Sequence, residues 1–549
     1  MSSSTLSAVI EKLIHSLCLN DFPCGNGFNL QRNTKGNAER AEMESTDALL
    51  DLLSCPHSPW RHDVMWSPQA LPLRQLAVLT PERLHAPFIY NYFTSLRIVD
   101  RDVTAIDGGL LKFSKLEELV LSANKISEVP TANLPGTLKI LELRANRLSS
   151  LDSLASGAPP PHLQYLGLGS NTLGSHNDVT HLTGRHWPQL VCLDLSDCGF
   201  QDQPALLNSL STLPCLRTLL LEGNPFALAS SYPGLTVDSL PQLSCLDTSW
   251  ISPEERIRFR GLAKMSGEFV STASPTVSVG RMTGIPDPRM IVDDKAPDFP
   301  VVSYRYFITY EFLRHQTPAH SVTYPSHTFE VFSISTTVLR HSTSKLSWSE
   351  SMDFGDTQTH TVSALGDLKK FLNRGLRLCL EEEKVLSWPA ASEEKKGRRE
   401  KDVSVSCKSD FTKSKDKNKK SVPELVQDAP IRRILGSVHI PLQSLVRGGQ
   451  QVKVLCDFGV LHTDSEVEAT QTHQKDLGRK NKEDKKKEDK ETKGRQHNAA
   501  SSKDKEKKAF EVHDSITSQQ EPVIVELIVE LKKWQTASEA HHFLLPQTS

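Results

Sequence analysis

Large apolar residues recur along residues 96–226 at offsets that match neither one face of a helix nor a simple alternating strand. Six segments align without gaps, with starting positions 20 to 27 residues apart. They share the pattern L-x-x-L-x-L-x-x-N-x-L, which is degenerate in the first copy. Self-similarity with this period predicts stacked leucine-rich repeats. The copies are LRIVDRDVTAI (96–106), LEELVLSANKI (116–126), LKILELRANRL (138–148), LQYLGLGSNTL (163–173), LVCLDLSDCGF (190–200) and LRTLLLEGNPF (216–226).

Side-chain packing explains which residue type stands at each position of the repeat. The central L-x-L predicts a short strand whose leucines face one way, so that stacked strands form a parallel sheet over one core. The asparagine stands where the chain turns, and its amide can satisfy backbone groups that no sheet partner reaches. Cys198 takes its place in the fifth copy, residues 190–200. The predicted structural residues are Leu116, Leu119, Leu121, Asn124, Leu138, Leu141, Leu143, Asn146, Leu163, Leu166, Leu168, Asn171, Leu190, Leu193, Leu195, Cys198, Leu216, Leu219, Leu221 and Asn224.

Both ends of the stack need a cover, because a terminal repeat exposes its core. Residues 230–259, with Tyr232 and the run Glu254-Glu255-Arg256, resemble the C-terminal cap of the repeats in protein phosphatase regulators, splicing factors and axonemal dynein light chains. Helical patterns at 5–19, 44–54 and 71–86 are expected to cover the first strand.

A second set of segments is spread over nearly the whole chain. Among them are FPCG (22–25), HSPW (57–60), ITYEF (308–312), EEEKVLSWP (381–389) and CDFGVL (456–461). These segments resemble cilia-associated leucine-rich repeat proteins. The resemblance implies a cytoplasmic protein of ciliated cells without catalytic activity.

The hydrophobic pattern changes in the second half of the chain. Residues 301–312 alternate, with Tyr304, Tyr306, Ile308, Tyr310 and Phe312 on one face. The order of cues resembles a C2-type antiparallel β-sandwich. Strands are likewise expected at 328–338, 345–354, 376–386, 434–446, 451–461 and 522–534.

Calcium-dependent lipid binding is not expected of this sandwich. Calcium sites gather several carboxylates, because the ion takes six to eight oxygen ligands. Asp353, Asp356 and Asp457 form no paired D-x-D motif. A protein-contact or purely structural sandwich fits the sequence better.

The predicted fold class is therefore an α/β leucine-rich repeat solenoid with a helical N-terminal cap, followed by a C2-like antiparallel β-sandwich with disordered inserts. The predicted layout is a helical cap at 1–90, repeats with their C-terminal cap at 91–262, a linker at 263–298, and the sandwich at 299–549 with inserts at about 391–421 and 464–519.

The charge of the chain bears on its expected partners only through one local segment. The chain has a formal net charge of −2, which argues against a global attraction to nucleic acid or membrane. The second insert, however, holds 14 Lys and Arg against 8 Asp and Glu over 475–508. Such a run can dock on acidic polymers, including tubulin tails or RNA, or it can be a solvated loop. It contains no interleaved aromatic residues for base stacking, so nucleic acid is not the expected partner.

No catalytic, cofactor or metal constellation is predicted. The ten cysteines form no CxxC pair and are interpreted as free thiols of a reducing compartment. The glycines of LGLGSN flank strand leucines, and His541-His542 lack metal-ligand spacing. The N-terminus predicts an amphipathic helix, not a signal peptide. No apolar run approaches the length of a membrane span.

The non-leucine positions of the strands are expected to form a concave face that binds protein. Several of these positions are apolar where folding requires none, with charged residues around them. The alternatives are an empty face or one covered by the protein's own second half. The predicted protein-binding residues are Val120, Ile140, Glu142, Arg144, Tyr165, Asp194 and Leu220.

These observations favour a non-enzymatic scaffold of the cytoplasm, and the resemblance points to the cilium or axoneme. The expected partners are proteins, with axonemal or microtubule-associated proteins as the candidates, and no small-molecule substrate is expected. The shared cap leaves two alternatives open, a cytosolic phosphatase-regulatory adaptor and an RNA-associated repeat protein.

Overall fold

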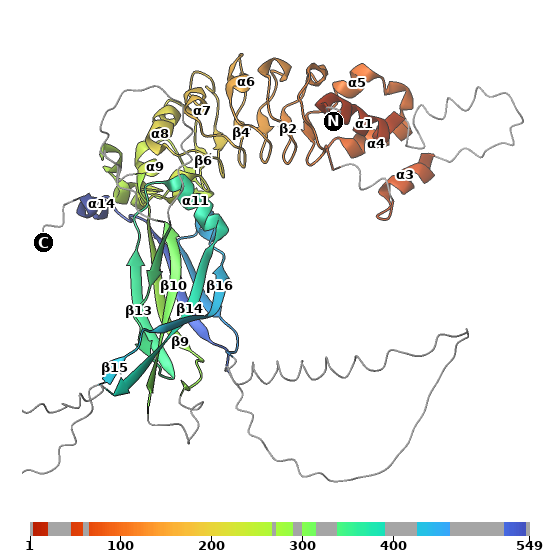
Figure 1. The fold of residues 1–549 in the computed structure, drawn as a ribbon. Helices are drawn as coiled ribbons and strands as arrows, with labels where there is room; N and C mark the ends of the chain where they lie inside the picture. Colours follow the sequence, from red (N-terminus) through yellow and green to blue (C-terminus); the bar gives the residue numbers. More distant parts are fainter. Residues whose placement is uncertain are drawn as a thin grey trace, which may run out of the picture.

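The computed structural model describes residues 4–19, 46–58, 65–265, 271–288, 299–313, 338–389, 425–461 and 521–544. They form two units, a stack of repeats and a pair of antiparallel sheets that extends from its C-terminal end (Figure 1). The predicted repeat solenoid with a parallel sheet, followed by antiparallel sheets, is confirmed. Both predicted inserts, and nearly all of the strand predicted at 328–338, lie outside the described residues.

The repeats build an eight-stranded sheet whose strand order follows the chain. Strands β1 to β7 pair in parallel, and only the last pair, β7 with β8, is antiparallel. The strands are β1 (Ser95–Arg97), β2 (Glu118–Val120), β3 (Ile140–Glu142), β4 (Tyr165–Gly167), β5 (Cys192–Asp194), β6 (Thr218–Leu220), β7 (Cys245–Leu246) and β8 (Ser249–Trp250).

The repeat leucines form one continuous core. Leu119, Leu141, Leu166, Leu193 and Leu219, the central residues of five strands, are fully buried. Burial of each leucine side chain contributes about 1.5–3 kcal/mol. The solenoid is therefore held together along its length by identical contributions from consecutive repeats.

The asparagines close the turn after each strand. The Asn224 amide donates to the carbonyls of Leu195, at 2.7 Å, and Leu221, at 2.9 Å, while its oxygen accepts from the Phe200 N–H. Cys198 supplies only weaker bonds, from its sulfur to two carbonyls. The residue before this position has a positive φ in every one of these copies, namely Ala123, Ala145, Ser170, Asp197 and Gly223.

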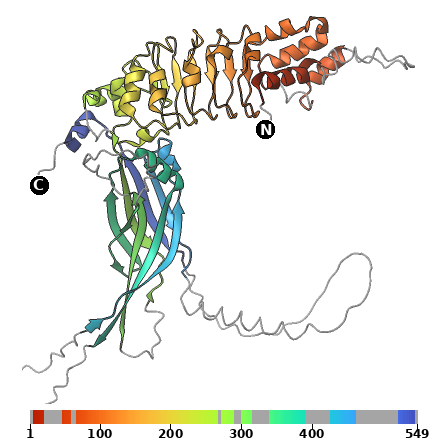
Figure 2. The ribbon, with the colours of Figure 1, turned by 45° about the horizontal axis from the view of Figure 1, so that its top comes forward.

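Helices cover the N-terminal end of the stack, as Figure 2 shows. Leu6, Ile10 and Leu73 are fully buried in the same core as the repeat leucines. The helical patterns at 5–19, 44–54 and 71–86 correspond to α1 (Leu6–Ile14) with the π-helix η1 (His15–Leu19), α3 (Thr46–Ser54), and α4 (Ala70–Leu79) with η4 (Pro81–Arg83); α5 (Ala86–Tyr90) follows.

Short helices return the chain between the repeat strands, and two more follow the last strand. Those between strands are η5 (Gly108–Lys112), η6 (Thr131–Asn133), α6 (Asp152–Ala155), α7 (His176–His181), α8 (Gln203–Ser211), η7 (Pro225–Leu228) and α9 (Gly234–Ser239). After β8 come α10 (Pro253–Phe259) and η8 (Leu262–Lys264). In Figure 1 the helices α6, α7 and α8 lie along the side of the stack opposite the strands.

The second unit consists of two antiparallel sheets. A four-stranded sheet has the order β13-β9-β18-β17, and a six-stranded sheet is built around β10 and β14. Their strands are β9 (Ser274–Thr283), β10 (Val301–Leu313), β11 (Val338–Ser342), β12 (Leu346–Ser347), β13 (Ser351–Thr359), β14 (Leu376–Pro389), β15 (Leu425–Gln427), β16 (Ile431–Ile440), β17 (Gln451–Asp457) and β18 (Ile524–Lys532). The helices are α11 (Leu365–Arg374), α12 (Gln443–Val446) and α14 (Ala537–Leu544).

Several boundaries differ from the sequence expectation. The segment expected to be a linker, 263–298, contains β9, which pairs with both β13 and β18. Its ten residues alternate between buried and partly exposed positions, a signal hidden by the small residues among them. The strand predicted at 345–354 is divided between β12 and β13, and the one at 434–446 ends at Ile440 before α12.

The two units pack against each other. Leu228 and Ala229, at the end of η7, belong to the core of the sandwich, whereas Trp534 and Ala540 belong to the core of the repeats. Lys369 of α11 donates to the carboxylate of Asp197, at 2.9 Å. The sandwich therefore closes the C-terminal end of the stack together with the cap.

Candidate functional site: the concave face of the repeats

The parallel register fixes the columns of the concave face. Ile140 of β3 lies beside Tyr165 of β4, and Glu142 lies beside Gly167. On the next strand, Gly167 lies beside Asp194. Because the intervening leucines point into the core, these side chains point to the opposite face.

A tyrosine and a glutamate form the first contact on this face. The Tyr165 hydroxyl donates to the Glu142 carboxylate at 2.5 Å, and the other oxygen of this carboxylate accepts from the Arg144 N–H at 2.7 Å. Burial raises the pKa of Tyr165 far above its ordinary value, and the charge of Glu142 raises it further. The hydroxyl therefore remains a hydrogen-bond donor throughout the physiological range.

An arginine forms the second contact and reaches across a whole strand. Arg144, which follows β3, donates to Asp194 at 3.0 Å and to Ser196 at 2.9 Å. It passes over Gly169, two residues after the end of β4, where a Cβ atom would lie 2.8 Å from the Ser196 hydroxyl. A Cβ at Gly167 would lie 2.4 Å from the Glu142 carboxylate. The two glycines of LGLGSN therefore make room for these polar side chains.

All seven predicted binding residues lie on or beside this face. Glu142, Arg144, Tyr165 and Asp194 form the hydrogen-bonded network just described. Ile140 lies beside it with 37 % of its surface exposed. Val120 and Leu220 are half-buried and stand one strand further out on each side, next to Glu142 and Asp194 respectively. The structure brings the charged residues together and leaves one apolar side chain exposed among them.

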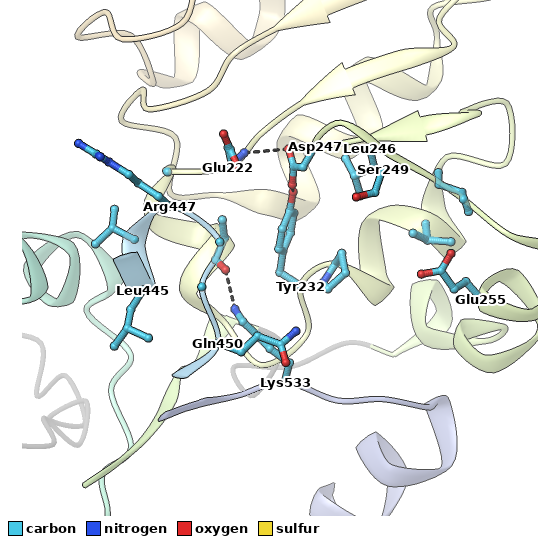
Figure 3. Close-up of a pocket in the computed structure, with 18 of the residues that line it drawn as sticks. Glu222, Tyr232, Leu246, Asp247, Ser249, Glu255, Leu445, Arg447, Gln450 and Lys533 are labelled. Carbon is cyan, nitrogen blue, oxygen red and sulfur yellow. Dashed lines mark hydrogen bonds between the residues drawn. The ribbon is translucent and has the colours of Figure 1, made fainter. Parts of the chain in front are cut away.

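A pocket of about 320 Å³ at the junction of the two units was not anticipated. As Figure 3 shows, Tyr232 points toward Asp247, to which its hydroxyl donates. The Asp247 carboxylate also accepts from the N–H groups of Leu221, at 2.6 Å, and Glu222, at 2.9 Å. Tyr232 belongs to the cap motif recognised in the sequence, but nothing there indicated that Asp247 would anchor it.

Lys533, from the far end of the chain, forms part of this junction. Its ammonium group donates to the carbonyls of Ala227, at 2.6 Å, and Ala229, at 2.8 Å, and lies 5.9 Å from the centre of the Tyr232 ring. Burial lowers its pKa to about 7. A contact between residues some 300 positions apart carries no local sequence signal.

The other candidate sites are not assembled. Asp353 lies on β13 and Asp457 on β17, which are the opposite edges of the four-stranded sheet. In the described ranges, no three His, Cys, Asp or Glu residues are grouped so that they could hold a metal ion. None of the described helices is both long enough and apolar enough to cross a membrane.

Two sequence profiles match the chain on either side of the repeats. The N-terminal domain of leucine-rich repeat-containing protein 43 matches residues 13–85, and its C-terminal domain matches residues 323–546. The human protein of this name is 31 % identical over 98 % of this chain and 96 % of its own length. The chain belongs to the leucine-rich repeat-containing protein 43 family.

A second relative supports this assignment. The mouse member of the leucine-rich repeat-containing protein 43 family is also 31 % identical, over 84 % of this chain and 87 % of its own length. Among solved structures, an internalin from Listeria monocytogenes covers 29 % of this chain and 48 % of its own, at 17 % identity and a TM-score of 0.23. That likeness is restricted to the repeat fold, and no functional argument rests on it.

Proposed function

We propose that this member of the leucine-rich repeat-containing protein 43 family is a non-enzymatic scaffold whose concave repeat face binds a partner protein. The observation that carries the proposal is the combination of an exposed Ile140 with the network of Glu142, Tyr165, Arg144 and Asp194. Aromatic residues and arginine dominate the energetics of protein interfaces, and a charged rim around an apolar contact supplies specificity.

The network supports binding because its side chains are already ordered. Immobilising a long side chain on association costs about 0.5–1.5 kcal/mol, and here hydrogen bonds within the protein offset part of that cost. Arg144 still has 46 % of its side chain exposed, so it can also contact a partner. The exposure of Ile140 and Arg144 supports an open face, because no described part of the sandwich covers these two side chains.

The proposed location is the cilium, and the proposed partners are axonemal or microtubule-associated proteins. This part of the proposal rests on the resemblance to cilia-associated repeat proteins noted in the sequence. Localising a fluorescently tagged copy in a multiciliated cell tests it. We expect the signal along cilia, whereas a signal confined to the cell body or the nucleus would contradict the location.

Quantitative affinity capture from multiciliated cells tests the binding face. We expect Ile140→Glu to reduce capture of specific partners about tenfold, because a charge then replaces the exposed apolar contact. Leu111→Glu is the matched control, since Leu111 lies in the return helix η5 and is 49 % exposed. Equal capture by the two variants would contradict the proposal.

The identity of the captured material separates the remaining alternatives. Axonemal proteins that depend on Ile140 would support the scaffold. A phosphatase catalytic subunit captured in their place would favour the phosphatase-regulatory adaptor. Material that is lost after nuclease treatment would favour the RNA-associated protein.

A further inference from the structure

The six-stranded sheet presents a second surface, on the side away from the sandwich core. Along β10, Tyr306, Ile308 and Tyr310 belong to that core, so Arg305 and Phe307 point to the opposite side. In the antiparallel register, Arg305 lies beside Glu383 of β14, and Glu383 lies beside Arg432 of β16. We call this surface the basic face and define it by Arg305, Phe307, Arg340, Lys345, Arg432 and Ile434.

Two buried glutamates lie beneath the cations of the basic face. Glu383 accepts hydrogen bonds from Lys345 and, at 2.9 Å, from the Nε of Arg432, although only 3 % of its own side chain is exposed. Glu381 accepts from Arg340 in the same way. The hydrogen bond from Lys345 holds the pKa of Glu383 below its ordinary value. The anions are thus hidden, while 56 % of the Arg432 side chain is exposed.

An aromatic ring fixes the positions of two of these cations. Phe307 is buried, and the Lys345 ammonium lies 5.6 Å and the Arg432 guanidinium 5.9 Å from its ring centre. Cations over an aromatic face are attracted by its quadrupole. The basic face is therefore pre-organised, which lowers the entropy cost of binding.

Donors remain available on this surface. Arg432 uses its Nε for Glu383, and within the described part of the chain its terminal nitrogens have no acceptor. Arg305 is exposed and forms no ion pair with any described residue. Ile434 of β16, which lies beside Glu381 of β14, has 61 % of its surface exposed and adds an apolar contact.

We propose that the basic face binds an acidic polypeptide segment of a partner protein, with aspartate or glutamate side chains around an apolar residue. Planar guanidinium groups match carboxylates in geometry, and the charges are complementary. Electrostatic membrane attachment uses clusters of roughly four to eight Lys or Arg residues. A membrane surface fits less well, because three of the four cations here, Arg340, Lys345 and Arg432, are already paired with glutamates. Here the buried glutamates already neutralise part of the positive charge.

Binding of a fluorescein-labelled peptide of about 12 residues, composed of Glu, Asp and Leu, to the full-length protein tests this inference by fluorescence anisotropy. We expect Arg305→Glu to raise the Kd about tenfold, and 300 mM salt to weaken binding further. Lys453→Glu is the matched control, because it makes the same charge change on an exposed position of β17, in the other sheet. We expect it to change the Kd by less than about twofold. Equal losses in the two variants would overturn the proposal.

Vesicles that contain phosphatidylserine provide the second arm of the test. We expect co-sedimentation with these vesicles to be the same for Arg305→Glu and Lys453→Glu. If Arg305→Glu specifically abolished vesicle binding while peptide binding stayed as in the unmodified protein, the peptide assignment would be overturned. Arg305→Gln removes the same cation without adding a carboxylate beside Glu383. We expect it to weaken peptide binding in the same direction and to unfold at the same temperature as the parent protein.

Discussion

The repeat stack and the sandwich satisfy their buried polar groups in different ways. In the stack, Asn224 bonds backbone groups of its own and the preceding repeat, within 29 residues. In the sandwich, Glu383 bonds side chains from two other strands or loops, Lys345 and Arg432. The stack uses a neutral group against the backbone, and the sandwich uses charged pairs at its surface. The first solution recurs with the sequence period, whereas the second depends on which strands happen to pair.

Removal of an asparagine amide should have the largest effect on stability. Asn224→Ala leaves the Leu195 carbonyl and the Phe200 N–H without their partner and removes one of two bonds to the Leu221 carbonyl, and each lost bond costs about 1 kcal/mol or more. We expect the free energy of unfolding of the repeats to fall by about 3 kcal/mol, measured by urea denaturation.

The reverse substitution at the fifth repeat provides the control. Where Asn171 bonds the Leu148 N–H, the corresponding Leu173 N–H has no acceptor in the described part of the chain. We expect Cys198→Asn to raise the free energy of unfolding by about 1 kcal/mol. A loss in both variants would show that the asparagine does not act through these backbone bonds.

Neutralisation of Glu383 should have an intermediate effect. Glu383→Gln removes two charge-assisted bonds, but Lys345 and Arg432 are partly solvated, so we expect a loss of about 1–2 kcal/mol at pH 7. Because the pKa of Glu383 is lowered on folding, its contribution is present above the unfolded value of 4.5 and disappears as the pH falls through the lowered folded value. Denaturation curves of the parent protein and of Glu383→Gln between pH 3 and pH 7, at steps of about one pH unit, measure this contribution to the free energy of unfolding. A difference that persisted unchanged at pH 3 would contradict the charged pair.

The junction between the units should also gain stability as the pH rises, but in a more alkaline window than Glu383. Burial lowers the pKa of Lys533 from 10.5 to about 7, so the unfolded chain binds more protons between these values and stability rises with pH across this window. We expect this rise, followed as the melting temperature of the cap and α14 region, to be reduced in Lys533→Met. An identical pH profile in the variant would show that the ammonium group is not desolvated at the junction.

The repeats could be predicted in detail because their determinants are local. Each strand, its buried leucines and its asparagine lie within eleven residues. The roles of Leu193 and Asn171 can therefore be predicted from their own repeats, without knowledge of the rest of the chain. Even the degenerate first copy forms its strand, β1. The residues of the concave face follow directly from the alternation in these strands.

The sandwich could be predicted only as a class. β9 was interpreted as part of a linker, because its small residues are recognisable as a strand only when β13 and β18 pair with it from 70 and 240 residues away. The network between Arg144 and Asp194 was likewise hidden, since it requires Gly169 to let one side chain cross a strand. Hydrophobic pattern specifies which side of a strand is buried, but it does not specify long-range pairing.

Photo-crosslinking tests the central claim, that the open concave face holds another protein. A benzophenone amino acid placed at position 140 or, as a control, at position 111 reports which surface touches a partner in a multiciliated cell. We predict discrete, reproducible protein adducts from position 140 and few from position 111. Equal adduct yields at the two positions, or adducts from position 111 alone, would contradict the account.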